Sequence, residues 1–203
     1  HGGWVWVVGA IAPQDSKDSF LCRYEIATGT WERFGEAQGY RGEDVDAIYE
    51  DRQGRVWLGT GRGLRRFDGR RFEDFGVATS LGEESVCAIL EDSDRRLWIG
   101  VVGGGLRCLD PTWETFTMDE GLPSNGVTRL LETGQDLLIG TKEGLSRLRR
   151  GLSNSFDLLY PKRISSLRAD PQGRLWVAKG GPLSVLTSDG TEVLTNLTEV
   201  INA

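Results

Sequence analysis

The sequence contains few residues of the kinds that catalytic and metal sites need. Its single histidine, His1, is the first of 203 residues. Nucleophilic triads and most zinc sites depend on histidine, so a Ser-His-Asp or Cys-His arrangement is excluded. The three cysteines, Cys22, Cys87 and Cys108, are 65 and 21 residues apart, which fits neither a zinc motif nor a disulfide framework. We therefore predict no metal site and no cofactor.

Acidic residues outnumber basic ones, 30 to 24, and long apolar segments are absent from the sequence. The net charge of −6 makes nucleic acid an unexpected partner. No apolar run approaches the roughly 20 residues that a membrane helix needs, so we predict no membrane segment in this chain. The printed segment also shows no signal peptide.

Glycine, in contrast, is abundant, with 28 residues at regularly spaced turn positions. The most regular stretch, Ala47–Phe75, has short apolar runs separated by Asp-x-x-Gly, Gly-x-Gly and Asp-Gly. Similar text recurs about every 40 residues, which is typical of β-propeller blades with four strands each. The sequence therefore predicts an all-β, five-bladed propeller built from four-stranded antiparallel blades.

Two series of large side chains set the register of the repeat. On the second strands, Trp57, Trp98, Leu138 and Trp176 are separated by 41, 40 and 38 residues, and on the fourth strands Trp31, Phe72, Trp113 and Phe156 are separated by 41, 41 and 43. One large ring at a fixed place in each blade fills the wedge between neighbouring sheets. We therefore expect these side chains to pack in the core and not to form a stacking platform for a ligand.

The repeat predicts a single domain over residues 1–203. The expected blades are 199–203 together with 1–35, then 45–76, 86–117, 127–160 and 164–195. Ile201-Asn202-Ala203 matches the first-strand segment Val45-Asp46-Ala47, whereas no first strand precedes Trp4. The two ends would thus complete one blade and close the ring, although a cut from a larger propeller remains an alternative.

Four features together resemble the two-component-regulator propeller repeat. They are Asp-x-x-Gly-x-(Leu/Val)-Trp-(Ile/Leu/Val)-Gly-Thr, a following Gly-Leu-x-Arg-(Phe/Leu), an aromatic fourth strand, and the loop Asp119–Val127 before a first strand. The departures are Leu138 in place of tryptophan, the shortened turn Gly134-Gln135-Asp136, Val177-Ala178-Lys179 in place of Ile-Gly-Thr, and the insertion Ala12–Ser19.

The resemblance implies a sensor-type domain. Similar propellers form the extracytoplasmic input regions of bacterial sensor kinases and nucleotide cyclases, and they often bind carbohydrate fragments. An extracytoplasmic or periplasmic location follows as an expectation from the resemblance. Such sensors usually carry more than five repeats, and this chain contains no kinase, receiver or cyclase segment.

The repeated acids are expected to be structural. Asp51, Asp92, Asp94 and Asp170 fall in turns, where aspartate bonds its own backbone. A ligand is expected instead at the loops that lead into first strands and at the hairpins that join second to third strands, since both lie on one face of a propeller. The candidate ligand-binding residues are Tyr40, Arg41, Glu43, Thr60, Arg62, Glu84, Ser124, Asn125, Thr141, Lys142 and Lys179.

Three functional hypotheses remain open. The favoured one is non-catalytic binding of a polar small molecule, a carbohydrate or a protein partner, with no catalytic residue assigned. The second is a propeller lyase or hydrolase that uses carboxylates of the central channel. The third is a lectin-like or scaffold module that uses the grooves between blades.

Overall fold

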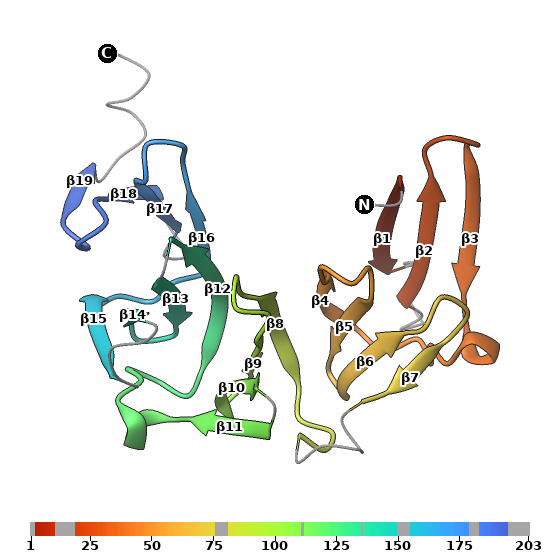
Figure 1. Cartoon of the computed structure of the whole chain (residues 1–203), viewed down its shortest axis with the longest axis horizontal. Coiled ribbons are helices and arrows are strands. Elements are labelled where there is room, and N and C mark those ends of the chain that lie inside the picture. The colour runs from red at the N-terminus through yellow and green to blue at the C-terminus, as the bar shows by residue number, and fades with distance from the viewer. Residues whose placement is uncertain are drawn as a thin grey trace. The chain divides into compact units, whose positions relative to one another are not determined.

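A computed structural model describes residues 3–10, 19–75, 81–110, 112–134, 136–149, 155–178 and 183–194 of the chain. The chain divides into two compact units, His1–Ile89 and Leu90–Ala203, here called unit 1 and unit 2. Every sheet is an antiparallel meander, in which strands that are neighbours in sequence are neighbours in the sheet (Figure 1).

Unit 1 contains two sheets and most of a strand of a third. The first sheet has the order β1-β2-β3, and the second has the order β4-β5-β6-β7. The strands are β1 (Trp4–Ala10), β2 (Ser19–Glu25), β3 (Thr30–Phe34), β4 (Val45–Glu50), β5 (Val56–Thr60), β6 (Gly63–Phe67) and β7 (Phe72–Asp74), with the short helix η1 (Glu36–Gln38) between β3 and β4. The strand β8 (Val86–Glu91) crosses the boundary between the units.

Unit 2 contains the rest of the third sheet, β11-β10-β9-β8, and two further sheets of four strands each, β12-β13-β14-β15 and β16-β17-β18-β19. Its elements are β9 (Leu97–Val101), β10 (Gly105–Asp110), β11 (Thr112–Phe116), η2 (Met118–Glu120), β12 (Val127–Thr133), β13 (Asp136–Thr141), β14 (Leu145–Arg149), β15 (Phe156–Tyr160), β16 (Ser166–Ala169), β17 (Leu175–Ala178), β18 (Leu183–Leu186) and β19 (Glu192–Leu194).

The five sheets confirm the predicted blades of four-stranded type. The first sheet has three strands among the described residues, and they correspond to the second, third and fourth strands of a blade. The segment Ile201–Ala203, expected to supply its first strand, lies outside the described residues, so ring closure by this segment stays a prediction. The assignment of residues 1–203 to a single domain also stays a prediction.

Glycine sets the turns between first and second strands. Gly54 and Gly173 have φ of 77° and 78°, in the left-handed region that only glycine adopts at little cost. In the third sheet this turn place is taken by Arg95 with φ of 67°, the single described residue other than glycine with positive φ. The repeated Asp-x-x-Gly is therefore a backbone requirement of the turn.

The glycine at the end of the second-strand motif has a different role, because it permits close packing. A Cβ atom added to Gly59 would lie 2.6 Å from the carbonyl oxygen of Val86. A Cβ atom on Gly140 would lie 2.8 Å from Cγ2 of Ile164. Both contacts are with the start of the next repeat, so glycine here sets how closely successive repeats approach.

Three of the four side chains that repeat on the second strands are buried, as predicted. Trp57, Trp98 and Leu138 are exposed by 1%, 2% and 2%, whereas Trp176 is half-buried. In the fourth-strand series Phe72 is buried, and Trp113 and Phe156 are half-buried. The prediction is wrong for Trp31, which is 63% exposed and lies tilted against Tyr24 with a centroid distance of 4.9 Å. Within β3 the residue that enters the core is Phe34, at 2% exposure.

Replacing Gly59 with alanine tests the close approach. We expect Gly59→Ala to lower the free energy of unfolding by about 1–3 kcal/mol, because the backbone of Val86 has to move. Gly61→Ala is the matched control, since a Cβ atom there meets no atom within 4 Å. Chemical denaturation of both variants gives the comparison, and equal stabilities would contradict the packing role.

Candidate functional site

An aspartate organises the turn between the first and second strands in three repeats. Asp51 and Asp92 are buried, and Asp170 is half-buried. In unit 1, Oδ1 of Asp51 accepts hydrogen bonds from the backbone nitrogens of Gln53 and Arg55, at 3.0 and 2.9 Å. Oδ2 accepts from Nε of Arg55 at 2.6 Å and from Nε1 of Trp57 at 2.8 Å. The carboxylate thus joins the turn to the core tryptophan.

Unit 2 repeats this arrangement twice. Asp92 accepts from the indole nitrogen of Trp98 at 2.8 Å and from Nε of Arg96 at 2.8 Å. Asp170 accepts from Trp176 at 2.9 Å and from Arg174 at 2.7 Å. The predicted turn role of these aspartates therefore holds, and their bond to tryptophan is an addition that strand periodicity alone did not indicate.

These contacts set the charge of the three carboxylates. Burial raises the pKa of Asp51 and of Asp92, but hydrogen bonds from the tryptophan and arginine partners outweigh it, so both values lie below the ordinary 3.8. For Asp170 the hydrogen bond from Trp176 is the largest cause, and the pKa falls to about 2. All three acids are therefore ionised near neutral pH, and none has the raised pKa that a general acid needs.

The candidate ligand-binding residues of unit 1 divide into supporting and exposed groups. Tyr40 is 2% exposed, and its hydroxyl donates to the carbonyl of Glu43 at 2.8 Å. Glu43 is itself buried and forms an ion pair with the buried Arg65. The side chains of Arg41, Arg62 and Glu84 are exposed.

The structure brings loop and hairpin together in unit 1. The backbone nitrogen of Gly61 donates to the carbonyl of Asp44 at 3.2 Å. Gly63 lies against the loop into the next repeat, since a Cβ atom there would be 2.9 Å from the carbonyl oxygen of Gly82. The hairpin that carries the exposed Arg62 is therefore held by the loop before β4 on one side and lies against the loop before β8 on the other.

Thr60 and Thr141 use their hydroxyls inside the hairpins. Thr60 donates to the carbonyl of Gly63 at 3.0 Å and accepts from the backbone nitrogen of Arg62. Thr141 donates to Gly144 at 2.9 Å and accepts from the nitrogens of Glu143 and Gly144. Both residues are fully buried, so their place in the motif is explained by the hairpin itself.

Unit 2 joins three loop segments by backbone contacts. An isolated β-bridge pairs Val102 with Gly126. Gly105 donates to the carbonyl of Asn125 at 3.0 Å, and the nitrogen of Lys142 donates to the carbonyl of Gly126 at 2.9 Å. The hairpin after β9, the loop before β12 and the hairpin after β13 therefore form one continuous backbone platform.

The side chains on this platform differ in exposure and in their contacts. Val102 is 48% exposed, and Lys142 and Glu143 are exposed. Oδ1 of Asn125 accepts from the backbone nitrogen of Met118 at 2.8 Å, and Oγ of Ser124 accepts from Gly126 at 3.1 Å. We call Val102, Asn125, Lys142 and Glu143 the loop surface of unit 2. The candidate Lys179 lies outside the described residues.

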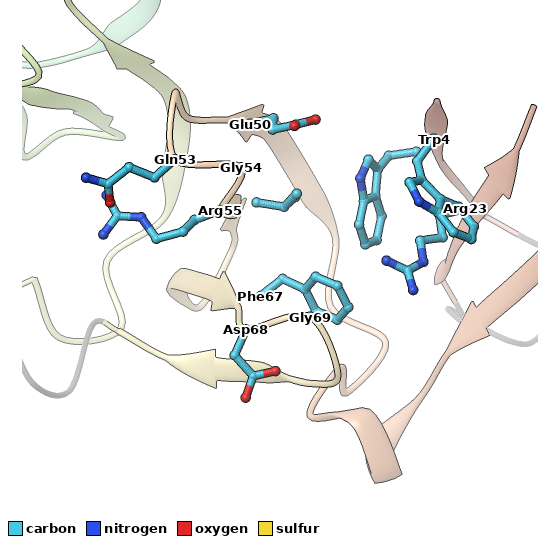
Figure 2. Close-up of a pocket in the computed structure, with 11 residues that line it drawn as sticks. Trp4, Arg23, Glu50, Gln53, Gly54, Arg55, Phe67, Asp68 and Gly69 are labelled. Atoms are coloured by element: carbon cyan, nitrogen blue, oxygen red, sulfur yellow. The ribbon is translucent and has the colours of Figure 1, made fainter. Parts of the chain in front are cut away.

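A cavity of about 550 Å³ lies at the other end of the strands, within unit 1. Trp4 and Arg23 line one side, the segment Glu50–Val56 lies across from them, and Phe67 and Asp68 complete the wall (Figure 2). The guanidinium carbon of Arg23 is 4.1 Å from the ring centroid of Trp4. This cavity was not among the predicted sites, because its walls come from strand starts and turns of two sheets.

Within the described ranges, no three Asp, Glu, Cys or His side chains gather as a metal-binding group. Burial raises the pKa of the Cys108 thiol to about 12, so the reactive thiolate is not populated near neutral pH.

Neither helix in the described part of the chain is long and apolar enough to span a membrane.

Comparison with solved structures shows a β-propeller fold. The chain is similar to the extracellular domain of a one-component system of B. thetaiotaomicron, with 17% identity over 94% of this chain and a TM-score of 0.73. It is also similar to the extracellular domain of a hybrid two-component system of the same organism, with 22% identity over 86% of this chain and a TM-score of 0.70. The chain spans 29% and 26% of the length of these two structures.

Another similar structure is a gluconolactonase of Xanthomonas campestris, with 14% identity, a TM-score of 0.64, and coverage of 88% of this chain and 69% of that one. A search of curated proteins found no match. Residues 39–62 and 80–103 match the family model "Two component regulator propeller". Two segments of the chain therefore match the repeat that its motifs resemble.

Removing the carboxylate of Asp92 tests its structural role. We expect Asp92→Ala to cost at least about 3 kcal/mol of unfolding free energy, because the indole nitrogen of Trp98 and two backbone nitrogens lose their acceptor. Asp94→Ala is the control: it removes an exposed carboxylate whose ion pair with Arg96 is worth about 0–1 kcal/mol. Urea denaturation of both variants measures the difference, and similar losses would contradict the role.

Acid should destabilise the protein in a defined pH window. Asp51, Asp92 and Asp170 have folded-state pKa values below the ordinary 3.8. Their stabilisation is therefore fully present above about pH 4 and is lost as the pH falls towards about 2, the pKa of Asp170. Urea midpoints measured from pH 5 to pH 2 should fall in this range, and by less in Asp170→Asn. An identical pH profile in Asp170→Asn would contradict the role of the Asp170 carboxylate in acid destabilisation.

Proposed function

We propose that the chain is a non-catalytic recognition module of a sensor-type protein, which binds a polar ligand or a protein partner through loops at one end of its blades. The observation that carries this proposal is a contrast between two sets of polar side chains, the carboxylates bonded within the turns and the charged side chains exposed in the loops. The repeated carboxylates Asp51, Asp92 and Asp170 are each occupied by a tryptophan and an arginine. The loops, in contrast, present exposed charged side chains to solvent, among them Arg62, Lys142 and Glu143.

The loop surface of unit 2 supports binding because its backbone is braced before any ligand arrives. Backbone bonds from Gly105 and Lys142 connect its three segments. A surface ordered in advance loses little conformational entropy on binding, so more of the contact energy contributes to affinity. Lys142, Glu143 and the amide of Asn125 offer hydrogen bonds, and Val102 offers a small apolar contact. This combination suits a sugar or another polar molecule.

The two-component regulator repeat supports a sensory setting and an extracytoplasmic location. The similar domains of B. thetaiotaomicron are described as extracellular parts of one-component and hybrid two-component systems. The likeness to a gluconolactonase concerns the fold alone. The alternative is an enzyme that uses carboxylates of the central channel. Chemical change of a bound ligand would support that alternative.

Ligand binding is tested by a thermal-shift screen with mono- and oligosaccharides, followed by a glycan array. For a sugar that raises the melting temperature, we expect Lys142→Ala to weaken binding at least tenfold with the melting temperature of the free protein unchanged, because Lys142 is exposed and only its backbone nitrogen is bonded within the platform. Arg70→Ala, an exposed arginine in the turn before β7, is the control and should bind normally.

Three results would contradict the proposal. The first is an equal loss of sugar affinity in Lys142→Ala and Arg70→Ala. The second is that neither a sugar in the screen nor a candidate protein partner binds. The third is formation of a product from a bound sugar. Product formation that one carboxylate substitution abolishes would support the enzyme hypothesis instead.

A further inference from the structure

Three polar side chains of unit 2 gather around Gly126, and each has an acceptor oxygen already in use or has no acceptor. Oδ1 of Asn125 accepts a hydrogen bond from the backbone nitrogen of Met118 at 2.8 Å. Oγ of Ser124 accepts one from the backbone nitrogen of Gly126 at 3.1 Å. The ammonium group of Lys142 contains donors only. These side chains therefore mainly offer donors to a ligand: the amide Nδ2 of Asn125, the hydroxyl hydrogen of Ser124 and the ammonium group.

The side chain of Lys142 is placed by Gly126. A Cβ atom added to Gly126 would lie 2.7 Å from Cδ and 2.9 Å from Cγ of Lys142, so the alkyl chain of the lysine runs directly over the glycine. The φ of Gly126 lies outside the left-handed region, so its backbone does not need the conformational freedom of glycine. The missing side chain at this position thus lets the lysine lie against the loop that carries Ser124 and Asn125.

No acid in the described part of the chain forms an ion pair with the exposed ammonium group of Lys142. Glu143, the next residue of the hairpin, is also exposed, and its backbone nitrogen donates to Oγ1 of Thr141 at 3.2 Å. On η2 the carboxylate of Glu120 is used internally, because it accepts from the backbone nitrogen and the hydroxyl of Thr117 at 2.6 and 2.8 Å. The positive charge over Gly126 is therefore available to a ligand.

A group of donors around one lysine suits a ligand group that only accepts hydrogen bonds. Carboxylates and sulfates have several oxygens and no hydrogen to donate, whereas a sugar hydroxyl also needs an acceptor for its own hydrogen. Hydrogen bonds from an ammonium group to an oxyanion are roughly twice as strong as those between neutral groups. The chemistry around Gly126 therefore favours an anionic ligand over a neutral one.

We propose that the loop surface of unit 2 recognises an oxyanion, a carboxylate or a sulfate carried by a sugar. This inference rests on the proposed function and narrows its ligand from polar to anionic. Lys142 supplies the charge, while Nδ2 of Asn125 and the hydroxyl of Ser124 each donate a hydrogen bond to the oxyanion. Val102, which pairs with Gly126, offers an apolar contact to the rest of the sugar. Gly126 is a positioning residue that acts through the lysine.

Three probes that share one ring test the preference on the full chain by isothermal titration calorimetry: glucose, glucuronate and glucose 6-sulfate. We expect at least one of the two anions to bind more tightly than glucose by about tenfold or more, and Lys142→Ala to remove the difference. The anion with the higher affinity identifies the group as carboxylate or sulfate. Added salt should weaken the binding of the anion and leave glucose unaffected, because salt screens exposed charge.

Glu143→Gln separates an anionic ligand from a neutral one. For an anion, the substitution should raise the affinity, because it removes a negative charge beside Lys142. For a neutral sugar, it should lower the affinity, because the carboxylate of Glu143 is the acidic acceptor that the loop surface offers to hydroxyl groups. A lower affinity of Glu143→Gln for glucuronate and glucose 6-sulfate would overturn the proposal.

Gly126→Ala displaces the lysine side chain without removing its charge. We expect this variant to bind the preferred anion about threefold or more weakly, and to cause no further loss when Lys142→Ala is also present. An equal loss with and without the lysine would overturn the positioning role of Gly126.

Failure of this inference differs from failure of the proposed function. Glucose that binds as tightly as both anions, or binding by neutral sugars alone, would overturn the oxyanion site and leave sugar recognition by the loops intact. Anion binding that Lys142→Ala does not weaken would also overturn the site. If no sugar in the titrations or in the wider screen binds, and no protein partner does, both the inference and the proposed function are contradicted.

Discussion

The bond between an aspartate and the indole nitrogen of a tryptophan is the interaction on which three of the repeats depend. The same carboxylate holds two backbone nitrogens of the turn, the side chain of an arginine and the tryptophan of the second strand. An ionised acid in this position is tolerated because every lone pair faces a donor. One group thus fixes turn conformation, strand register and the position of the ring between sheets.

The repeated aspartates serve the structure of the turns, so they are not candidates for catalysis. Carboxylates at regular spacing in a propeller invite a catalytic interpretation, but Asp51, Asp92 and Asp170 have lowered pKa values and hydrogen-bond partners within their own turns. The threonines of the motif are likewise occupied inside hairpins. What remains for a ligand is the set of exposed loop side chains, which differ from one repeat to the next.

The two ends of the strands therefore have different characters. In unit 2 the loops into first strands and the second-to-third hairpins form a braced platform with exposed polar groups. In unit 1 the opposite end contains a cavity lined by aromatic and charged side chains. The loop end of unit 2 is the one that suits recognition of a polar molecule.

Much of the fold could be predicted from the sequence because the physical causes are local. Asp-x-x-Gly specifies a turn with positive φ, and the short apolar runs around Trp57 and Trp98 specify strands that are buried throughout. A spacing of about 40 residues then implies repeated blades. The candidate residues Arg62 and Lys142 are exposed as loop residues should be, while Tyr40, Glu43 and Thr60 are buried because neighbouring backbone uses their polar atoms.

Other features depend on contacts that sequence spacing does not encode. Trp31 shares its spacing with buried aromatics, yet it is exposed, because burial depends on what lies beyond the outer strand. The cavity beside Trp6 emerges only when strand pairing brings together residues that are far apart in the sequence. By itself the sequence determined the repeat, its turns and its strands. Tertiary structure decided which polar groups are satisfied within the fold, since that depends on neighbours brought together by packing.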